Sequence, residues 1–295
     1  MVSILIPVYN CNVLRLVSEL NIQALILDID YEILVADDCS PDFKIKNVNR
    51  GIEKFENCTY YEFPENKGRS FTRKFLAEKS LHSYLLFLDA DVFPKRGTFL
   101  ADFDFKNIKT DAIFGGVEYE DTSPATNMTL RWKYGKNRES RTVDQRNKFP
   151  YLSIISGCML INRELFLKAN SFLENKYGID ILFTYNLEKA KISVKHIDNP
   201  VIHYGLETNK IFLEKTKKAI ESIIFFEKTG EIPKDFRPIQ KAYIKLKKNR
   251  MTGLFSTIIN KFEAKILKNL CSENPSLFLF DLYRLHLYGL LNSKK

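Results

Sequence analysis

Short apolar runs alternate with helical periodicity over roughly the first two hundred residues of the chain. The runs are typical of buried strands, because they are short and end at polar residues or proline. They cover residues 2–8, 31–36, 58–63, 84–88, 112–117, 154–161, 192–196 and 201–204. Apolar residues recur at helical spacing over 13–24, 68–80, 163–169 and 179–189. Strands alternating with helices predict an α/β fold, with a mostly parallel Rossmann-like sheet and helices on both of its faces.

After residue 205 the pattern changes to helices alone. Stretches around 211–224 and 255–270 each carry one apolar stripe, and residues 277–291 are apolar almost all round. We therefore predict an α/β domain over 1–205 followed by a helical extension over 206–295. Residues 118–150 are polar and weakly periodic, which is typical of a functional or disordered segment.

The charge of the chain is concentrated in the predicted extension. The whole sequence has a net charge of +9, and residues 206–295 hold 18 Lys and Arg against 9 Asp and Glu, so the entire excess lies there. This asymmetry predicts a neutral catalytic part followed by a basic part with a role of its own.

Cysteine usage and hydropathy limit the class of protein. The five cysteines are scattered without a CxxC pair, which argues against a disulfide framework or a zinc site. The start of the chain lacks the pattern of a signal peptide, and no apolar segment is long enough to span a membrane. We therefore expect a cytoplasmic protein.

Two acidic pairs each end a predicted buried strand. Asp37 and Asp38 follow the strand at 31–36, and Asp89 and Asp91 follow the strand at 84–88. The carboxyl ends of parallel strands lie at one edge of a sheet, where ligands bind. In extended backbone Asp89 and Asp91 point to the same side, and a divalent cation would offset their repulsion. The alternative is a strand end with two solvated acids.

A basic helix start lies between the two acidic pairs. Gly68, Arg69 and Arg73 open the helix predicted over 68–80. A glycine and basic residues at a helix N-terminus suit a bound phosphate. The alternative is a capped helix with solvated arginines.

Four motifs in this order resemble family-2 glycosyltransferases of the GT-A fold. They are Ser3-Ile-Leu-Ile-Pro7-Val-Tyr9-Asn10, Asp37-Asp38-Cys-Ser40-Pro-Asp42, Asn66-x-Gly68 with Arg73, and Asp89-Ala90-Asp91. Each motif alone is short, and their order and spacing carry the resemblance over about residues 1–205. The resemblance implies an enzyme that uses a nucleotide-diphospho-sugar, with a UDP-sugar as the expected donor.

The resemblance also implies roles for residues in the four motifs. The first two motifs would cradle the base and the ribose, with Asp38 on the base. Arg73 would lie near base and phosphates. The Asp89-Ala90-Asp91 motif would bind ribose and a divalent metal, Mn²⁺ or Mg²⁺, with Asp91 as the metal ligand. Residues 1–100 would form the nucleotide-sugar half of the domain, and residues 101–205 the acceptor half.

Two further residues follow from the later part of the resemblance. Tyr177-Gly178-Ile179-Asp180 resembles a Gly-Glu-Asp stretch whose last Asp is the catalytic base, although Ile179 replaces the usual acid. Asp180 would be that base, or alternatively a plain helix N-cap. His203 stands where relatives carry a late metal-ligand histidine, and the alternative is a packed structural residue.

The implied reaction is transfer of a sugar, with inversion, to a hydroxyl of a glycan or of a lipid-linked acceptor. Two other classes stay open. Phe-Leu-Asp-Ala-Asp-Val also resembles the opening motif of haloacid-dehalogenase-type phosphatases, although those enzymes usually carry it on their first strand. The second alternative class is a basic nucleic-acid-binding module. The extension lacks a recognised DNA- or RNA-reading motif, so we expect no nucleic-acid partner.

The basic extension suggests a contact with an anionic membrane surface. Its densest cluster comprises Lys241, Lys245, Lys247, Lys248 and Arg250. Basic clusters of this kind are attracted to anionic lipid, and residues 277–291 would supply the apolar part without spanning the bilayer. The protein would then be peripheral on the inner face of the membrane. The alternative is that the helices pack on the catalytic domain or on a second subunit of a homo-oligomer.

Overall fold

The computed structural model describes residues 1–293 and divides them into two compact units. The first comprises residues 1–120, 139–175 and 186–205. The second comprises residues 121–138 and 176–185 together with the described residues from Leu206 onward. The chain passes between the units more than once, and the domain limits expected after residues 100 and 205 stay predictions.

The first unit contains a seven-stranded sheet in the order β3-β2-β1-β4-β8-β6-β9. The strands are β1 (Val2–Val8), β2 (Tyr31–Asp37), β3 (Cys58–Glu62), β4 (Tyr84–Leu88), β6 (Ala112–Phe114), β8 (Cys158–Asn162) and β9 (Val194–His196). Strands β3, β2, β1 and β4 are parallel, as are β6 and β9, whereas β8 is antiparallel to both its neighbours. The predicted mostly parallel sheet is confirmed.

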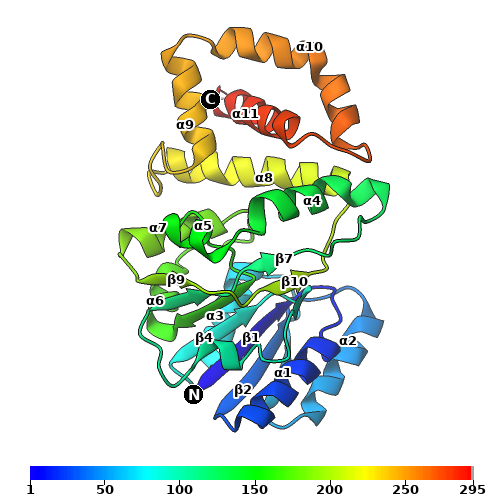
Figure 1. Cartoon of the computed structure of the whole chain (residues 1–295), viewed down its shortest axis with the longest axis vertical. Coiled ribbons are helices and arrows are strands. Elements are labelled where there is room, and N and C mark those ends of the chain that lie inside the picture. The colour runs from blue at the N-terminus through cyan, green and yellow to red at the C-terminus, as the bar shows by residue number, and fades with distance from the viewer. Residues whose placement is uncertain (294–295) are drawn as a thin grey trace. The chain divides into compact units, whose positions relative to one another are not determined.

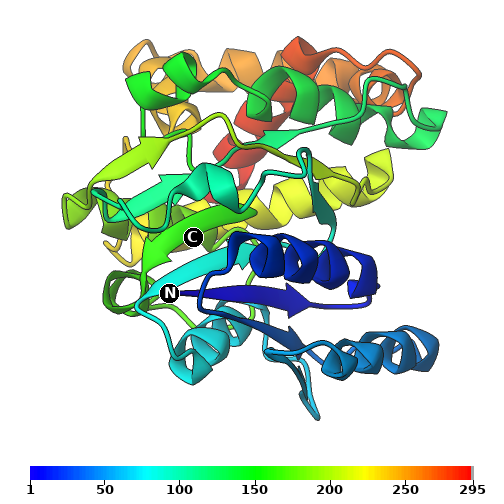
Figure 2. The ribbon, with the colours of Figure 1, turned by 60° about the horizontal axis from the view of Figure 1, so that its bottom comes forward.

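Helices cover both faces of this sheet, as predicted (Figure 1). Alternate residues of β1, β2 and β4 share one core cluster with α1 (Leu14–Leu27), which Figure 2 shows alongside the blue strand β1. The intervening residues face α3 (Arg69–Lys79) and α6 (Arg163–Ala169). The rings of Phe87 in β4 and Phe166 in α6, for example, lie 4.4 Å apart. The remaining helix beside these parallel strands, α2 (Phe43–Asn49), begins after Asp42, whose carboxylate caps it.

The first unit also contains a second, three-stranded sheet. It consists of β5 (Val92–Pro94), β10 (Val201–His203) and β7 (Val117–Glu118), with β10 in the middle. The single strand predicted over 112–117 is therefore wrong, because its two ends belong to different sheets. Gly115 and Gly116 separate them: Gly116 has a φ of +99°, and a Cβ on Gly115 would lie 2.3 Å from a backbone oxygen.

Two other segments differ from the sequence-based prediction. The strand predicted from residue 154 begins only at Cys158, because residues 154–157 form a loop whose carbonyl groups bind side chains and backbone near Asp89. Within 118–150, the chain forms α4 (Thr129–Tyr134), a π-helical turn and α5 (Val143–Lys148). A capping box between Thr142 and Gln145 starts α5.

The second unit is helical. Its main elements are α8 (Asn209–Lys228), α9 (Pro238–Lys248), α10 (Thr252–Leu270) and α11 (Leu277–Ser293), together with α4. In Figure 1, α8, α9 and α10 frame α11 on three sides. Phe280 and Tyr288 of α11 are each 1% exposed, whereas Phe278 is 68% exposed, so the apolar pattern of 277–291 reflects burial of part of this helix within the second unit. No helix within residues 1–293 is long and apolar enough to cross a bilayer.

Candidate active site

The first acidic residue after β2 is fully engaged by its surroundings. Asp37 is completely buried, and its Oδ1 accepts a hydrogen bond of 2.6 Å from the backbone N–H of Ser40. Its Oδ2 accepts one of 3.0 Å from the Tyr60 hydroxyl. Burial, and then the charge of Asp37, raise the pKa of Tyr60, so this hydroxyl remains a donor at neutral pH. Asp37 therefore holds the loop after β2.

Asp38 holds the loop that leads into α3. Its Oδ1 accepts from the backbone N–H of Lys67 at 2.6 Å and its Oδ2 from that of Gly68 at 2.8 Å. Gly68 has a φ of +88°, a conformation that favours glycine. Burial raises the pKa of Asp38, and the two backbone hydrogen bonds oppose that shift. The base contact that the resemblance implies for Asp38 stays a prediction.

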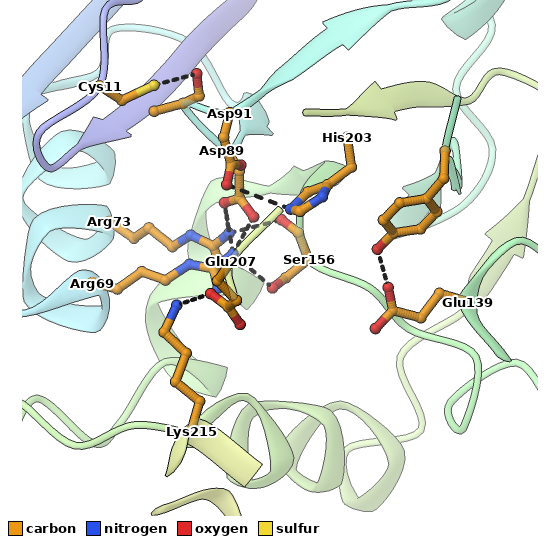
Figure 3. A network of polar contacts seen from close by, with 12 residues as sticks. Cys11, Arg69, Arg73, Asp89, Asp91, Glu139, Ser156, His203, Glu207 and Lys215 are labelled. Atoms are coloured by element: carbon orange, nitrogen blue, oxygen red, sulfur yellow. Dashed lines mark hydrogen bonds and ion pairs between the residues drawn. The ribbon is translucent and has the colours of Figure 1, made fainter. Parts of the chain in front are cut away.

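Two arginines of α3 converge on Asp89 (Figure 3). Arg69 Nη2 lies 2.6 Å and 2.5 Å from the two carboxylate oxygens, and Arg73 Nη2 lies 2.9 Å from Oδ1. Arg73 is buried and also donates to the Ser156 carbonyl at 2.7 Å, whereas the Arg69 side chain is 44% exposed. The sequence placed both arginines at a helix start that suits a bound phosphate, whereas the family resemblance gave a role to Arg73 alone. Their spacing of four residues places both on one helical face, where they meet the same carboxylate.

Asp91 faces His203 across the small sheet. His203 Nε2 lies 3.4 Å from Asp91 Oδ2. The backbone brings them together, because β10 pairs with β5 and the N–H of Tyr204 donates to the Asp91 carbonyl at 2.8 Å. Burial alone would raise the pKa of Asp91, but the hydrogen bond and charge of His203, with the charge of Arg69, lower it below its usual value. Asp91 is therefore ionised at neutral pH.

Gly205 permits the close approach of the chain to Asp91. A Cβ at this position would lie 1.9 Å from Asp91 Oδ2, so any side chain would displace the carboxylate. Sequence reasoning missed this residue, because a single glycine after a strand carries no signal of what it will meet.

An aromatic ring packs beside the His203 ring. The rings of Tyr119 and His203 lie 5.3 Å apart, and the Tyr119 hydroxyl donates to the Glu139 carboxylate (Figure 3). Tyr119 is 5% exposed, so its position is set by packing as well as by this hydrogen bond. The pair was not predicted, because Tyr119 and Glu139 lie in a segment without clear periodicity.

The pair Asp91 and His203 fits a divalent cation. Carboxylate oxygen suits Mg²⁺ and Mn²⁺, and Mg²⁺ is commonly held by one or two carboxylates together with substrate phosphates. His203 Nδ1 is buried without a hydrogen-bond partner in residues 1–293. When the ring proton is on Nδ1, Nε2 has a lone pair with which it can bind a cation together with the Asp91 carboxylate. Among these residues no group of three or more His, Cys, Asp or Glu could hold a metal, so a cation would need ligands from the substrate or from water.

The predicted residues of the first motif lie at the same edge of the sheet. Pro7 is in β1, and Tyr9 and Asn10 follow it and are exposed. The Asn10 N–H donates to Ser40 Oγ at 2.6 Å, which ties the loop after β1 to the loop after β2. The Ala90 carbonyl accepts from Cys11 Sγ at 3.3 Å, which ties it to the loop after β4. The ends of three parallel strands are thus linked.

Asp180, the predicted base, belongs to the second unit. It is the first residue of α7 (Asp180–Lys189), is half-buried, and its carbonyl accepts from the Thr184 hydroxyl at 2.8 Å. The turn before it is fixed, since Gly178 has a φ of +82° and a Cβ there would lie 2.8 Å from the Ala219 Cα in α8. Its part in catalysis stays a prediction.

Comparison with known proteins confirms the fold expected from the motifs. The model of glycosyl transferase family 2 matches residues 3–168. No curated protein sequence matches the chain.

Three solved structures that contain a nucleotide or a nucleotide-sugar are similar in fold. The mannosyltransferase PcManGT from Pyrobaculum calidifontis, in complex with GDP-Man and Mn²⁺, is 15% identical with a TM-score of 0.54, over 100% of this chain and 88% of that chain. Glucosyl-3-phosphoglycerate synthase from Mycobacterium tuberculosis, with Mg²⁺ and UDP, is 14% identical with a TM-score of 0.52, over 80% and 81%. S. aureus TarS 1–349 with UDP-GlcNAc is 15% identical with a TM-score of 0.50, over 99% and 90%. These similarities establish the GT-A fold.

Proposed function

We propose, on the premise that this chain belongs to glycosyl transferase family 2, that it moves a sugar from a nucleotide-diphospho-sugar to a hydroxyl of a glycan or lipid-linked acceptor. The transfer proceeds with inversion at the anomeric carbon. One observation carries the proposal: the loops after β1, β2 and β4 join at one sheet edge, where the arginines on Asp89 and the pair Asp91–His203 lie. We propose a UDP-sugar as donor, since two of the three similar structures contain a uridine nucleotide.

The charges at this edge suit a bound diphosphate. Arg69 and Arg73 together offset the charge of Asp89, so the acids do not repel an anionic donor. Arg73 is buried and fixed, whereas the more exposed Arg69 can exchange part of its contact with Asp89 for a phosphate oxygen. Arginine suits this purpose because its planar group binds carboxylate and phosphate alike. Asp89 is then left to bind the ribose, with Tyr9, Asn10 and Asp38 on the side of the base.

Asp91 and His203 would hold the divalent cation, Mn²⁺ or Mg²⁺. When bound, such a cation stabilises the negative charge of the leaving diphosphate as a Lewis acid. The lowered pKa of Asp91 keeps its carboxylate ionised and ready to bind a cation. Gly205 keeps space for that carboxylate.

Asp180 acts as the general base in this proposal. As the acceptor oxygen forms its bond to the anomeric carbon, the bond from that carbon to the diphosphate oxygen breaks, and the acceptor proton passes to Asp180. A well-placed base contributes roughly 10²–10⁴ in rate. The assignment rests on the resemblance of Tyr177–Asp180 to the family's Gly-Glu-Asp stretch.

The surroundings of Asp89 favour glycosyl transfer over a phosphatase reaction. A phosphatase of the haloacid-dehalogenase type would use Asp89 as its nucleophile, but Arg69 contacts both oxygens of this carboxylate. The family match over residues 3–168 points the same way.

The proposal also includes a location: a cytoplasmic protein, peripheral on the inner face of a membrane. The exposed basic residues at the end of α9 support this location.

A screen of nucleotide-sugars by thermal shift, with and without Mn²⁺, tests the proposal. A donor present at 100 times its Kd should stabilise the protein by about 2.7 kcal/mol. NMR of the product then reports the anomeric configuration, and a retained centre would reject the single displacement. Hydrolysis of a simple aryl phosphate, with no stabilisation by any nucleotide-sugar, would favour the phosphatase.

A further inference from the structure

One side of α10 exposes large apolar side chains. Leu254, Ile258 and Phe262 recur at every fourth position and are 61%, 47% and 44% exposed. Met251, just before the helix, is 45% exposed. A spacing of four places these side chains along one stripe of the helix. We call these four residues the α10 stripe.

The fold of the second unit does not require the α10 stripe. Ile259, Ile266 and Leu270 lie on another side of α10, are at most 5% exposed, and pack in the cluster around Phe280. The apolar face of the helix is thus wider than the part of it that is buried. Exposed patches of large apolar residues commonly mark sites of protein or membrane contact.

The surroundings of the stripe are strongly basic. Residues 238–270 contain eight Lys and Arg and one acidic residue, Glu263, a net charge of +7 (8 minus 1). The eight are Lys241, Lys245, Lys247, Lys248, Arg250, Lys261, Lys265 and Lys268. All are exposed. In the described part of the chain, none of the eight forms an ion pair, so their charge is not offset locally.

The basic and apolar groups lie side by side. The Nζ atoms of Lys261 and Lys265 are 6.0 Å and 5.9 Å from the ring centre of Phe262. Arg250 and Met251 are adjacent in the turn between α9 and α10. A partner of this surface must therefore accept apolar side chains and negative charge at the same place.

We propose that the α10 stripe and the basic residues around it bind the surface of an anionic lipid bilayer. The four apolar side chains would enter the boundary between headgroups and acyl chains, and the lysines would meet the anionic headgroups. The sequence had suggested residues 277–291 for the apolar part. In that segment Phe280 and Tyr288 are buried, and its exposed apolar residues Phe278 and Leu290 are twelve positions apart, so α10 with its continuous stripe takes this place.

Other partners fit this surface less well. A nucleic acid would use the basic residues but would leave Leu254 and Ile258 exposed to water. A second copy of the chain, placed face to face, would bring two surfaces of the same strong positive charge together, which is unfavourable. A bilayer with anionic headgroups satisfies both kinds of side chain.

Flotation of the full-length protein with lipid vesicles tests this proposal. The protein should bind vesicles that contain phosphatidylglycerol at low salt, and release them at high salt because screening weakens the attraction. It should bind pure phosphatidylcholine vesicles much less. Failure to bind the anionic vesicles at low salt would overturn the proposal.

Variants separate the apolar from the basic part. The triple change L254S/I258S/F262S should weaken binding about tenfold or more, since the inserted apolar area is lost. Lys261→Gln with Lys265→Gln should weaken it about fivefold for each residue. The matched apolar control is L25S/I26S, because Leu25 and Ile26 of α1 are 55% and 77% exposed and are not part of the surface.

A charge control and three outcomes complete the test. Lys106→Gln with Lys109→Gln removes two exposed lysines of the first unit and should leave binding unchanged. Binding unaffected by the triple apolar change, with vesicles displaced by duplex DNA, would overturn the proposal in favour of a nucleic acid. Self-association by light scattering that the triple change abolishes, without vesicle binding, would overturn it in favour of a second copy.

This inference does not rest on the proposed glycosyl transfer. The triple variant should keep the wild-type thermal shift with Mn²⁺ and nucleotide-sugar, because its changes lie in α10. Vesicle binding without any response to nucleotide-sugars would reject the proposed function and keep the membrane surface. The reverse result would reject this surface and the peripheral location, and would keep the proposed glycosyl transfer.

Discussion

Two acidic pairs that look alike in the sequence have different surroundings in the fold. Asp37 and Asp38 follow β2, are at most 5% exposed, and give all four carboxylate oxygens to protein donors. Asp89 and Asp91 follow β4, are partly exposed, and face arginine and histidine side chains. The first pair holds loops, and the second is the pair that we propose to meet the cation and the donor.

The difference lies in the type of partner. Backbone N–H groups are fixed donors that a ligand cannot displace without breaking the loop. Exposed side chains such as Arg69 can move and rebind. The carboxylates with mobile cationic partners are therefore the better candidates for contact with the donor. The predictions below test this distinction.

Replacing Asp91 should have the largest effect on activity. Asp91→Ala removes a proposed cation ligand, and the loss of several kcal/mol of charge stabilisation should reduce turnover by about 10³ or more. The melting temperature should change little, because this side chain is 39% exposed. Steady-state kinetics with Mn²⁺ measure the loss, and wild-type turnover would reject the assignment.

The matched change in the other pair should act on stability. Asp38→Ala leaves the buried N–H groups of Lys67 and Gly68 without their acceptor, at a cost of about 1–3 kcal/mol in unfolding free energy. Chemical denaturation measures that cost. If Asp38→Ala unfolded like the wild type, the distinction between the two pairs would not hold.

A third acid, Asp180, tests the chemistry separately from the donor. Asp180→Asn should reduce turnover by roughly 10²–10⁴ and leave the affinity for the nucleotide-sugar unchanged, because a base acts on the proton of the acceptor. Calorimetry for the donor and a transfer assay give the two quantities. A loss of donor affinity would move Asp180 to the nucleotide side.

Gly205 offers a test that leaves every polar group in place. Gly205→Ala forces the Asp91 carboxylate to shift, and a shift of about 1 Å can cost about a hundredfold in rate. Gly97→Ala is the matched control, since a Cβ there meets nothing within 4 Å. Equal activity of the two variants would show that the exact position of Asp91 is unimportant.

His203→Ala should weaken the affinity for Mn²⁺ by about 10- to 100-fold, because it removes one of the two protein groups at the proposed cation site. Titration with Mn²⁺ followed by electron paramagnetic resonance measures the affinity. A large fall in melting temperature with normal Mn²⁺ binding would indicate a packed structural residue, the other role considered for it.

The smallest effect concerns the pH dependence of stability. Burial raises the pKa of Asp38, so the folded protein holds this proton more tightly than the unfolded chain. The contribution of this proton to the free energy of unfolding is fully present below the pKa of Asp38 in the unfolded chain, about 3.9. It is lost as pH rises through the higher pKa of Asp38 in the folded protein. The difference in unfolding free energy between wild type and Asp38→Asn should therefore shrink as pH rises from 3.5 toward 7. Denaturation series across that range measure it, and a growing difference would contradict the burial argument.

The framework of the site follows from local patterns in the sequence. Strands β1, β2 and β4 could be predicted because each is a short apolar run, and their acids meet because parallel strands end at one edge. The different partners of Asp38 and Asp89 could not be predicted from the sequence, because the partners of both acids come from the same stretch around Arg69. The contact of Gly205 with Asp91 depends on β10 pairing with β5, which no local pattern encodes.

The helices of 118–150 were missed for another reason. Their sequence is polar and weakly periodic. Because α4 and α5 are each under two turns long, they are too short for apolar residues to recur at helical spacing. The spacing of Thr142 and Gln145 was a readable signal of a helix start. Arg146, four residues after Thr142, is 4% exposed and donates to backbone carbonyls, so it belongs to the scaffold of the first unit.

The pairing of β10 with β5 also sets when the site can form during synthesis. Asp91 leaves the ribosome long before His203 and Gly205, because a large part of the first unit lies between them in the chain. The parallel strands β1 to β4 can already fold, since domains fold as units from the N-terminal side during synthesis. The proposed cation site, however, cannot exist in that intermediate. The nascent chain would therefore carry a nearly complete sheet edge without the ability to bind a cation through both residues, until β10 emerges and pairs.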